Sequence, residues 1–178
     1  VGGKCVGAFP GTAYICVKEE ILKQITASQC KNVYLSLHKH YEMAKKSHQT
    51  PNTPNVNLFW PLNKALTDIL EIGLDKRILR YQRCAAIIRK GLSDMKLKLL
   101  LSDHMSNTVT SVFLPPDVPA QEFLKRMEER GYIFYMGKGK YADMNMIQIA
   151  NMGEIYEQDC RNMLEVFQVC LETFRKEK

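Results

Sequence analysis

The chain has 178 residues, of which 46% are hydrophobic and 25% are charged. This composition excludes a disordered chain, a collagen-like repeat and a disulfide-rich miniprotein. No uncharged apolar run reaches about 18 residues, so we expect neither a membrane-spanning helix nor a membrane partner. The sequence begins at Val1 without a methionine or a basic-then-apolar leader, and we interpret it as a piece of a longer chain.

The cysteines, histidines and charges indicate neither a metal site nor a nucleic-acid site. The six cysteines form no Cys-x-x-Cys pair, and we expect reduced thiols in a cytoplasmic protein. The four histidines lack zinc-site spacing, so no metal ion is expected. The net charge of +6 is spread along the chain without interleaved aromatic residues. It therefore indicates a solvated basic surface, with no nucleic acid as partner.

The first 52 residues are predicted to hold one strand, one short helix and one irregular segment. β-branched and aromatic residues run through 12–18 after the turn residues Pro10-Gly11, which predicts a buried strand. A short helix over 19–28 follows. From 35 to 51 the apolar period is lost, which indicates an irregular segment. A single strand has few partners to bury it, so this part is expected to expose apolar surface.

Two long helices are predicted next, over 53–72 and 75–90. Thr53-Pro54 is a typical helix start, and Gly73 is expected to end the first helix. Pro61 lies inside the pattern and is expected to kink or divide that helix. Gly91 is expected to end the second helix.

The last 88 or so residues alternate short strands with amphipathic helices. The expected strands cover 96–101, 108–114, 132–137 and 146–151, and the expected helices cover 119–130 and 156–174. Strands and helices in this order predict a two-layer α+β domain with one sheet face under two helices.

Lys4 is the one nucleophile that the sequence singles out, because it lies in a glycine-rich, apolar segment before a turn. Desolvation lowers the pKa of a lysine amine and makes it the nucleophile that Schiff-base chemistry needs. A lysine near a chain end is ordinarily a solvated charge, and composition alone leaves that alternative open.

Four segments of the chain share a pattern with one enzyme family. The segment 3–11, Gly-Lys-Cys-Val-Gly-Ala-Phe-Pro-Gly, resembles the lysine segment of the class V, fold-type I aminotransferases that depend on pyridoxal phosphate. Within them it is most similar to the 2-aminoethylphosphonate–pyruvate transaminases. The segments 50–53, 131–138 and 147–155 are similar to later motifs of the same family. Their order and spacing agree over nearly all of the chain.

The resemblance implies an α/β fold with an α+β small domain, namely the C-terminal half of a fold-type I transferase. Residues 1–52 would be the remnant of the large cofactor-binding domain and 53–90 the connecting helices. Residues 91–178 would be the small C-terminal domain. The family builds its site from two subunits, so a homodimer through the absent N-terminal half is also implied.

The resemblance also implies a reaction and a cofactor. An amino group would pass between an aminophosphonate-like donor and a keto acid, with pyridoxal 5'-phosphate as the electron sink. Lys4 would form the Schiff base and move the substrate proton, as catalytic and cofactor-binding residue. Thr50 falls where the family offers a hydroxyl to the cofactor phosphate, although an ordinary loop hydroxyl is an equally open interpretation.

The chain departs from the family pattern at the substrate-binding position. Gln148 stands where the family has an arginine that pairs with the substrate carboxylate, and an amide cannot replace that charged fork. The family's phosphate loop, ring-stacking aromatic residue and ring-nitrogen aspartate all precede the lysine. We therefore expect this chain alone to be inactive. The alternative hypothesis is a non-catalytic binding or assembly module derived from an aminotransferase.

Overall fold

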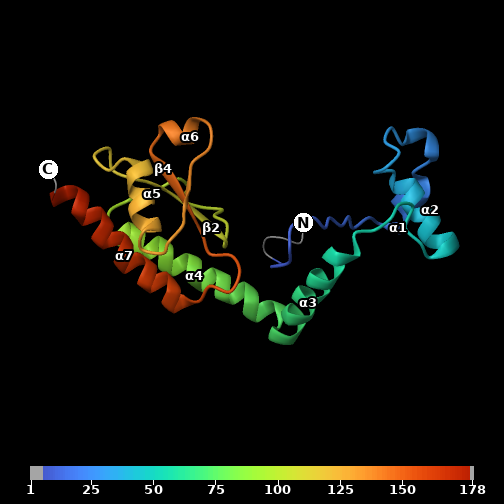
Figure 1. Cartoon of the computed structure of the whole chain (residues 1–178), viewed down its shortest axis with the longest axis horizontal. Coiled ribbons are helices and arrows are strands. Elements are labelled where there is room, and N and C mark those ends of the chain that lie inside the picture. The colour runs from blue at the N-terminus through green and yellow to red at the C-terminus, as the bar shows by residue number, and fades with distance from the viewer. Residues whose placement is uncertain (1–5, 177–178) are drawn as a thin grey trace. The chain divides into compact units, whose positions relative to one another are not determined.

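The structure is a computed structural model that describes residues 6–176, except for the side chain of Arg175. The chain divides into two compact units after Leu66. We call the first the N-terminal unit and the second, 67–178, the sheet unit. Each is described by itself (Figure 1). Among the described residues, no helix combines the length and the apolar character that a membrane span requires.

The N-terminal unit is helical where it is regular. It holds α1 (Glu19–Gln24), a 3₁₀ turn (Ala27–Gln29) and α2 (Leu37–Ser47), and α3 (Val56–Ile72) begins in it. The predicted strand over 12–18 is wrong: this segment has no regular secondary structure, and Ile15 is 68% exposed. A strand needs a neighbour for its backbone groups, and every strand among residues 6–176 lies between Lys98 and Ala150.

α2 occupies the segment that was predicted to be irregular. The Ser36 hydroxyl caps the helix by accepting the backbone N–H of Lys39 at 3.2 Å. The helix ends at His48, whose φ of 55° is left-handed. None of its residues is buried, and its few apolar residues lie among His, Lys and Ser residues, so the segment resembled an irregular one in sequence.

Two glycines, one before α4 (Leu74–Asp94) and one inside it, have different functions. Gly73, with a φ of 94°, separates α3 from α4 as predicted. The predicted helix end at Gly91 is wrong, because α4 continues to Asp94. A Cβ at Gly91 would lie 2.5 Å from Leu164 Cδ1, so glycine permits α7 to approach closely there. Pro61 lies inside α3 without dividing it.

The sheet unit contains one antiparallel sheet of four strands in the order β1-β2-β4-β3. The strands are β1 (Lys98–Leu99), β2 (Val109–Phe113), β3 (Tyr135–Met136) and β4 (Met146–Ala150). The helices are α5 (Ala120–Glu128), α6 (Lys140–Asp143) and α7 (Glu157–Lys176). The predicted order of strands and helices in this part is confirmed, with shorter edge strands than expected and with α6 in addition.

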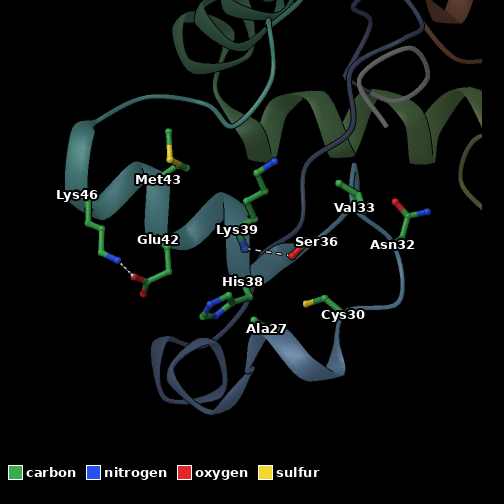
Figure 2. Close-up of a pocket in the computed structure, with 10 residues that line it drawn as sticks. All are labelled: Ala27, Cys30, Asn32, Val33, Ser36, His38, Lys39, Glu42, Met43 and Lys46. Carbon is green, nitrogen blue, oxygen red and sulfur yellow. Dashed lines mark hydrogen bonds and ion pairs between the residues drawn. The ribbon is translucent and has the colours of Figure 1, made fainter.

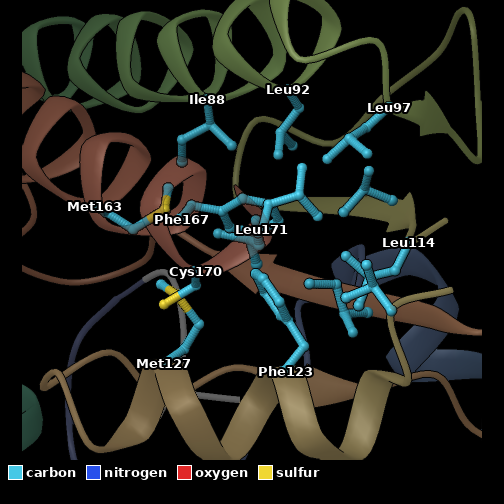
Figure 3. Packing of buried hydrophobic residues seen from close by; sticks show 14 of the residues in the cluster. Ile88, Leu92, Leu97, Leu114, Phe123, Met127, Met163, Phe167, Cys170 and Leu171 are labelled. Atoms are coloured by element: carbon cyan, nitrogen blue, oxygen red, sulfur yellow. The ribbon is translucent and has the colours of Figure 1, made fainter. Parts of the chain in front are cut away.

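The core of the sheet unit lies between one face of the sheet and three helices. The side chains of Val112, Ile147 and Ile149 project from that face into the core and are 0–2% exposed. α4, α5 and α7 cover them (Figure 3), so the predicted two-layer arrangement is confirmed with a third helix. Phe123 of α5 and Phe167 of α7 meet with their ring centroids 4.6 Å apart.

Asn145 fixes the connection between β2 and α5. Its φ of 55° is left-handed, which asparagine tolerates better than most residues. Its Nδ2 donates to the carbonyl of Val118 at 2.9 Å and to that of Pro115 at 3.0 Å, and its Oδ1 accepts the N–H of Ala120 at 2.8 Å. One side chain thereby holds the start of α5 and the loop before it.

Phe167→Ala is expected to lower the free energy of unfolding of the sheet unit by about 3–5 kcal/mol, because it removes a fully buried ring and leaves a cavity. Val169→Ala is the matched control on the same helix. Val169 is 56% exposed, so its truncation is expected to change the free energy by about 0.5 kcal/mol or less. Urea titration followed by circular dichroism measures both; equal losses in the two variants would contradict this account of the core.

Candidate functional site

Two of the residues predicted for the site belong to the N-terminal part of the chain. Lys4 lies outside the described residues. Thr50 follows α2 in an exposed loop, and its hydroxyl donates to the carbonyl of Asn52 at 2.7 Å. Gln148 belongs to the sheet unit.

Gln148 lies in the middle of β4, on the sheet face opposite the helical core. Its neighbours in sequence, Ile147 and Ile149, point into the core, so the two-residue period of a strand turns Gln148 to the other side. Directly across from it are Ser111 on β2 and Tyr135 on β3. Its Nε2 donates to Ser111 Oγ at 3.2 Å. These three residues form a neutral polar row across the sheet.

The same face has one cation on its edge strand. Lys98 of β1 is paired with Phe113 of β2, and its Nζ lies 6.0 Å from the centroid of that ring. Phe113 is two residues beyond Ser111 along β2, so Lys98 is separated from Gln148 both along and across the strands. The face can therefore attract an anion, but Gln148 itself contributes only hydrogen bonds.

A charged cluster that the sequence did not reveal joins the segment after β4 to α4. The guanidinium of Arg80 contacts the Glu154 carboxylate twice, at 2.9 and 3.2 Å, and also donates to the carbonyl of Gly153. The Tyr156 hydroxyl donates to the same carboxylate at 2.7 Å. Hydrogen bonds from Arg80 and Tyr156 lower the pKa of Glu154 to about 2.

Two further contacts hold this segment on α4. The Gly153 N–H donates to the Tyr81 hydroxyl at 3.3 Å, and Asn151 Nδ2 donates to the carbonyl of Tyr81 at 3.4 Å and to that of Asn107 at 3.0 Å. The end of the strand that bears Gln148 is thereby fixed to a helix about 70 residues earlier in the sequence. Residues so far apart in the sequence share no local spacing pattern, so the sequence alone did not predict these contacts.

The N-terminal unit has a hollow of about 410 Å³ beside α2 (Figure 2). Lys46 on its rim is paired with Glu42 at 2.8 Å. Its lining also includes Cys30 and His38, but neither Thr50 nor Gln148. His38 Nδ1 is hydrogen-bonded to the carbonyl of Ile25 at 2.9 Å. Because Lys46 and His38 already have these partners within the chain, the lining residues of the hollow offer no set of groups that converges on a ligand.

Glu154→Gln is expected to lower stability at pH 7 by about 1 kcal/mol or less, since the carboxylate is 59% exposed and its ion pair is screened by water. A folded-state pKa of about 2, below the ordinary 4.5, stabilises the fold above about pH 4.5. That contribution is lost as the pH falls toward 2. The difference in unfolding free energy between wild type and variant should therefore shrink over this range.

The matched control is Glu165→Gln, an exposed acid on α7. Urea titrations at several pH values between 2 and 7 measure all three proteins. A difference between wild type and Glu154→Gln that stays constant down to pH 2 would contradict the ion-pair account.

Comparison with known protein sequences finds aminotransferases. An uncharacterized aminotransferase of Methanocaldococcus jannaschii is 32% identical over 170 residues, which cover 94% of this chain and 44% of that protein. A 2-aminoethylphosphonate–pyruvate transaminase of Lysinibacillus sphaericus is 27% identical over 168 residues, covering 93% of this chain and 45% of the relative. The chain thus spans less than half the length of these relatives. No family model matches it.

Solved structures agree in fold. An alanine–glyoxylate aminotransferase from Nostoc sp. superposes with a TM-score of 0.84 at 20% identity, over 96% of this chain and 46% of that protein. A pyridoxamine–pyruvate aminotransferase from Mesorhizobium loti has the same TM-score at 23% identity, over 96% and 45%. The mixed α/β fold with its small antiparallel sheet therefore matches part of the fold-type I aminotransferases. Over nearly its whole length the chain is therefore similar, in sequence and in fold, to the C-terminal part of class V aminotransferases.

Proposed function

We propose that this chain is the C-terminal part of a pyridoxal-phosphate-dependent transaminase. The proposed reaction transfers an amino group between an aminophosphonate-like donor and a keto acid, as in a 2-aminoethylphosphonate–pyruvate transaminase. The observation that supports it most is the continuous likeness to aminotransferases in both sequence and fold, over more than nine-tenths of the chain.

The proposal assigns three parts to the chain. Residues 1–52 belong to the large cofactor-binding domain, 53–90 are the connecting helices, and 91–178 are the small domain. Dimerisation through the preceding half of the protein belongs to the same proposal. The exposure of apolar side chains such as Phe9, Ile15 and Trp60 is consistent with surfaces that other parts of the protein cover.

The residue types present fit a phosphorylated aldehyde cofactor in part. Lys4 would supply the amine that holds the cofactor. The Thr50 hydroxyl is exposed and donates only within its own loop, to Asn52, so a phosphate oxygen can replace that acceptor. Pyridoxal phosphate supplies the electron sink when bound, and Lys4 holds and moves the proton at its amine nitrogen.

Gln148 is proposed to face the substrate from β4. Its amide is held by Ser111, and Asn151, three residues beyond it, is bonded to the Tyr81 carbonyl on α4. A neutral amide binds a carboxylate or phosphonate more weakly than a guanidinium does. The same observation favours the second candidate function, a non-catalytic binding or assembly module in which Lys4 no longer serves catalysis.

The test of the proposal is to incubate the purified chain with pyridoxal phosphate, reduce it with borohydride and locate the modified lysine by peptide mass spectrometry. We expect stoichiometric modification confined to Lys4, because a desolvated amine reacts ahead of solvated ones. Lys4→Arg should abolish the modification, and Lys18→Arg, which changes an exposed lysine, should leave it intact. Modification scattered over other lysines, or none, would favour the binding module.

Gln148→Arg is expected to strengthen the binding of a keto acid such as pyruvate about tenfold in the complete enzyme that this proposal implies, since a charged, bidentate fork replaces an amide. Gln168→Arg adds the same charge on an exposed part of α7 and serves as the control. Calorimetric titration measures both. If the two variants bind pyruvate as the wild type does, Gln148 is not at the carboxylate position.

A further inference from the structure

A second cavity, of about 260 Å³, lies within the sheet unit. It is bordered by the loop 131–134, the end of β4 and the first turns of α7. Its walls are mostly apolar and include Ile88, Phe134, Ile149, Ile155 and Met163. An engineered apolar cavity of about 150 Å³ binds benzene, so this one has room for a single ring with a short side chain.

One carboxylate borders this apolar space. Asp159 is the only acid among the described lining residues, and it is exposed on the first turn of α7. Its Oδ2 accepts the backbone N–H of Tyr156 at 2.8 Å. No ion pair joins Asp159 to any cation in the described part of the chain, so its charge is available at the rim of the cavity.

The acids next to Asp159 differ from it, because both already have cationic partners. Glu154 is bound by Arg80, and Glu157 lies 3.2 Å from Arg161 and 3.7 Å from Arg83. Asp159 therefore has an unmatched negative charge at the opening of an apolar cavity. A ligand that complements both features has an apolar body and a cationic end.

The Cys160 thiol, which also lines the cavity, does not add charge. Burial raises the pKa of the Cys160 thiol to about 12, with the neighbouring Cys84 as a further cause, so the thiol is neutral at pH 7. The rings of Phe134 and Tyr132 also line the space, and aromatic faces attract ammonium groups. The cavity thus favours a cation over an anion.

We propose that this cavity is a binding site for a small primary amine with an apolar body, such as an arylalkylamine, whose ammonium group pairs with Asp159. The ring lies against Ile88, Ile149 and Met163, and the ammonium stays at the exposed rim. This site is independent of the proposed transamination, because neither Thr50 nor Gln148 lines it.

The test is a titration of the full 178-residue chain with 2-phenylethylamine, followed by amide chemical shifts in ¹H–¹⁵N NMR. The neutral probe 2-phenylethanol has the same ring and chain length. We expect saturable shifts that map to 131–134 and 155–163, with the amine binding about tenfold more tightly than the alcohol, since a charge-assisted contact adds to the same apolar burial.

Asp159→Asn keeps an oxygen that can accept the Tyr156 N–H, so the start of α7 is preserved while the charge is removed. It should remove the preference for the amine and leave the affinity for the alcohol unchanged. Glu165→Gln, on the same helix but away from the cavity, should leave both affinities unchanged. Ile155→Phe should weaken both probes by filling the space.

Three results would overturn the proposal. One is a preference for the amine that persists in Asp159→Asn. Another is a set of shifts that fails to saturate or maps away from the cavity. The last is equal binding of the amine and the alcohol to the wild type, which would leave an apolar cavity without selectivity for charge.

Discussion

Phe167 lies where α7, α5 and the sheet meet, and the sheet unit depends on the burial at this point. A short antiparallel sheet of four strands cannot exclude water from both faces, so one face must be covered for the strands to persist. α4, α5 and α7 supply that cover, and the close pass at Gly91 lets α4 and α7 lie over the same strands. The opposite face is then left for Gln148, Ser111 and Tyr135. Successive side chains of a strand point to opposite faces of the sheet. Because Ile147 and Ile149 of β4 point into the core, Gln148 between them points to the polar row on the opposite face.

The sequence predicted this part of the fold well because its information is local. β-branched residues recur along 109–113 and 146–150, and Pro119 and Gly131 bracket α5, so strand propensity and helix-end signals agreed. The N-terminal unit was harder. The residues 12–18 have strand propensity, but propensity forms no strand without a neighbour to pair with. α2 was missed because its few apolar residues lie among His, Lys and Ser residues.

The candidate site was predictable only where a motif is continuous in sequence. Gln148 falls inside such a segment, and its placement on the sheet face away from the core follows from the period of the strand. The contact of Arg80 with Glu154 joins residues 74 positions apart, and the cap that Asn145 provides for α5 spans 25. Contacts of this kind depend on the finished topology, so neither spacing nor composition indicates them. Gly91 is a related case: a glycine expected to end a helix instead serves the packing of two helices.

The two outermost strands of the sheet, β1 and β3, are each only two residues long. An edge of that length offers few unpaired backbone groups, and a foreign strand that added to it would gain few hydrogen bonds. Edge-to-edge joining with another chain is therefore disfavoured at both sides of this sheet. Recognition of the sheet unit by a partner then depends on surface side chains, so that its selectivity is set by residue type rather than by backbone pairing.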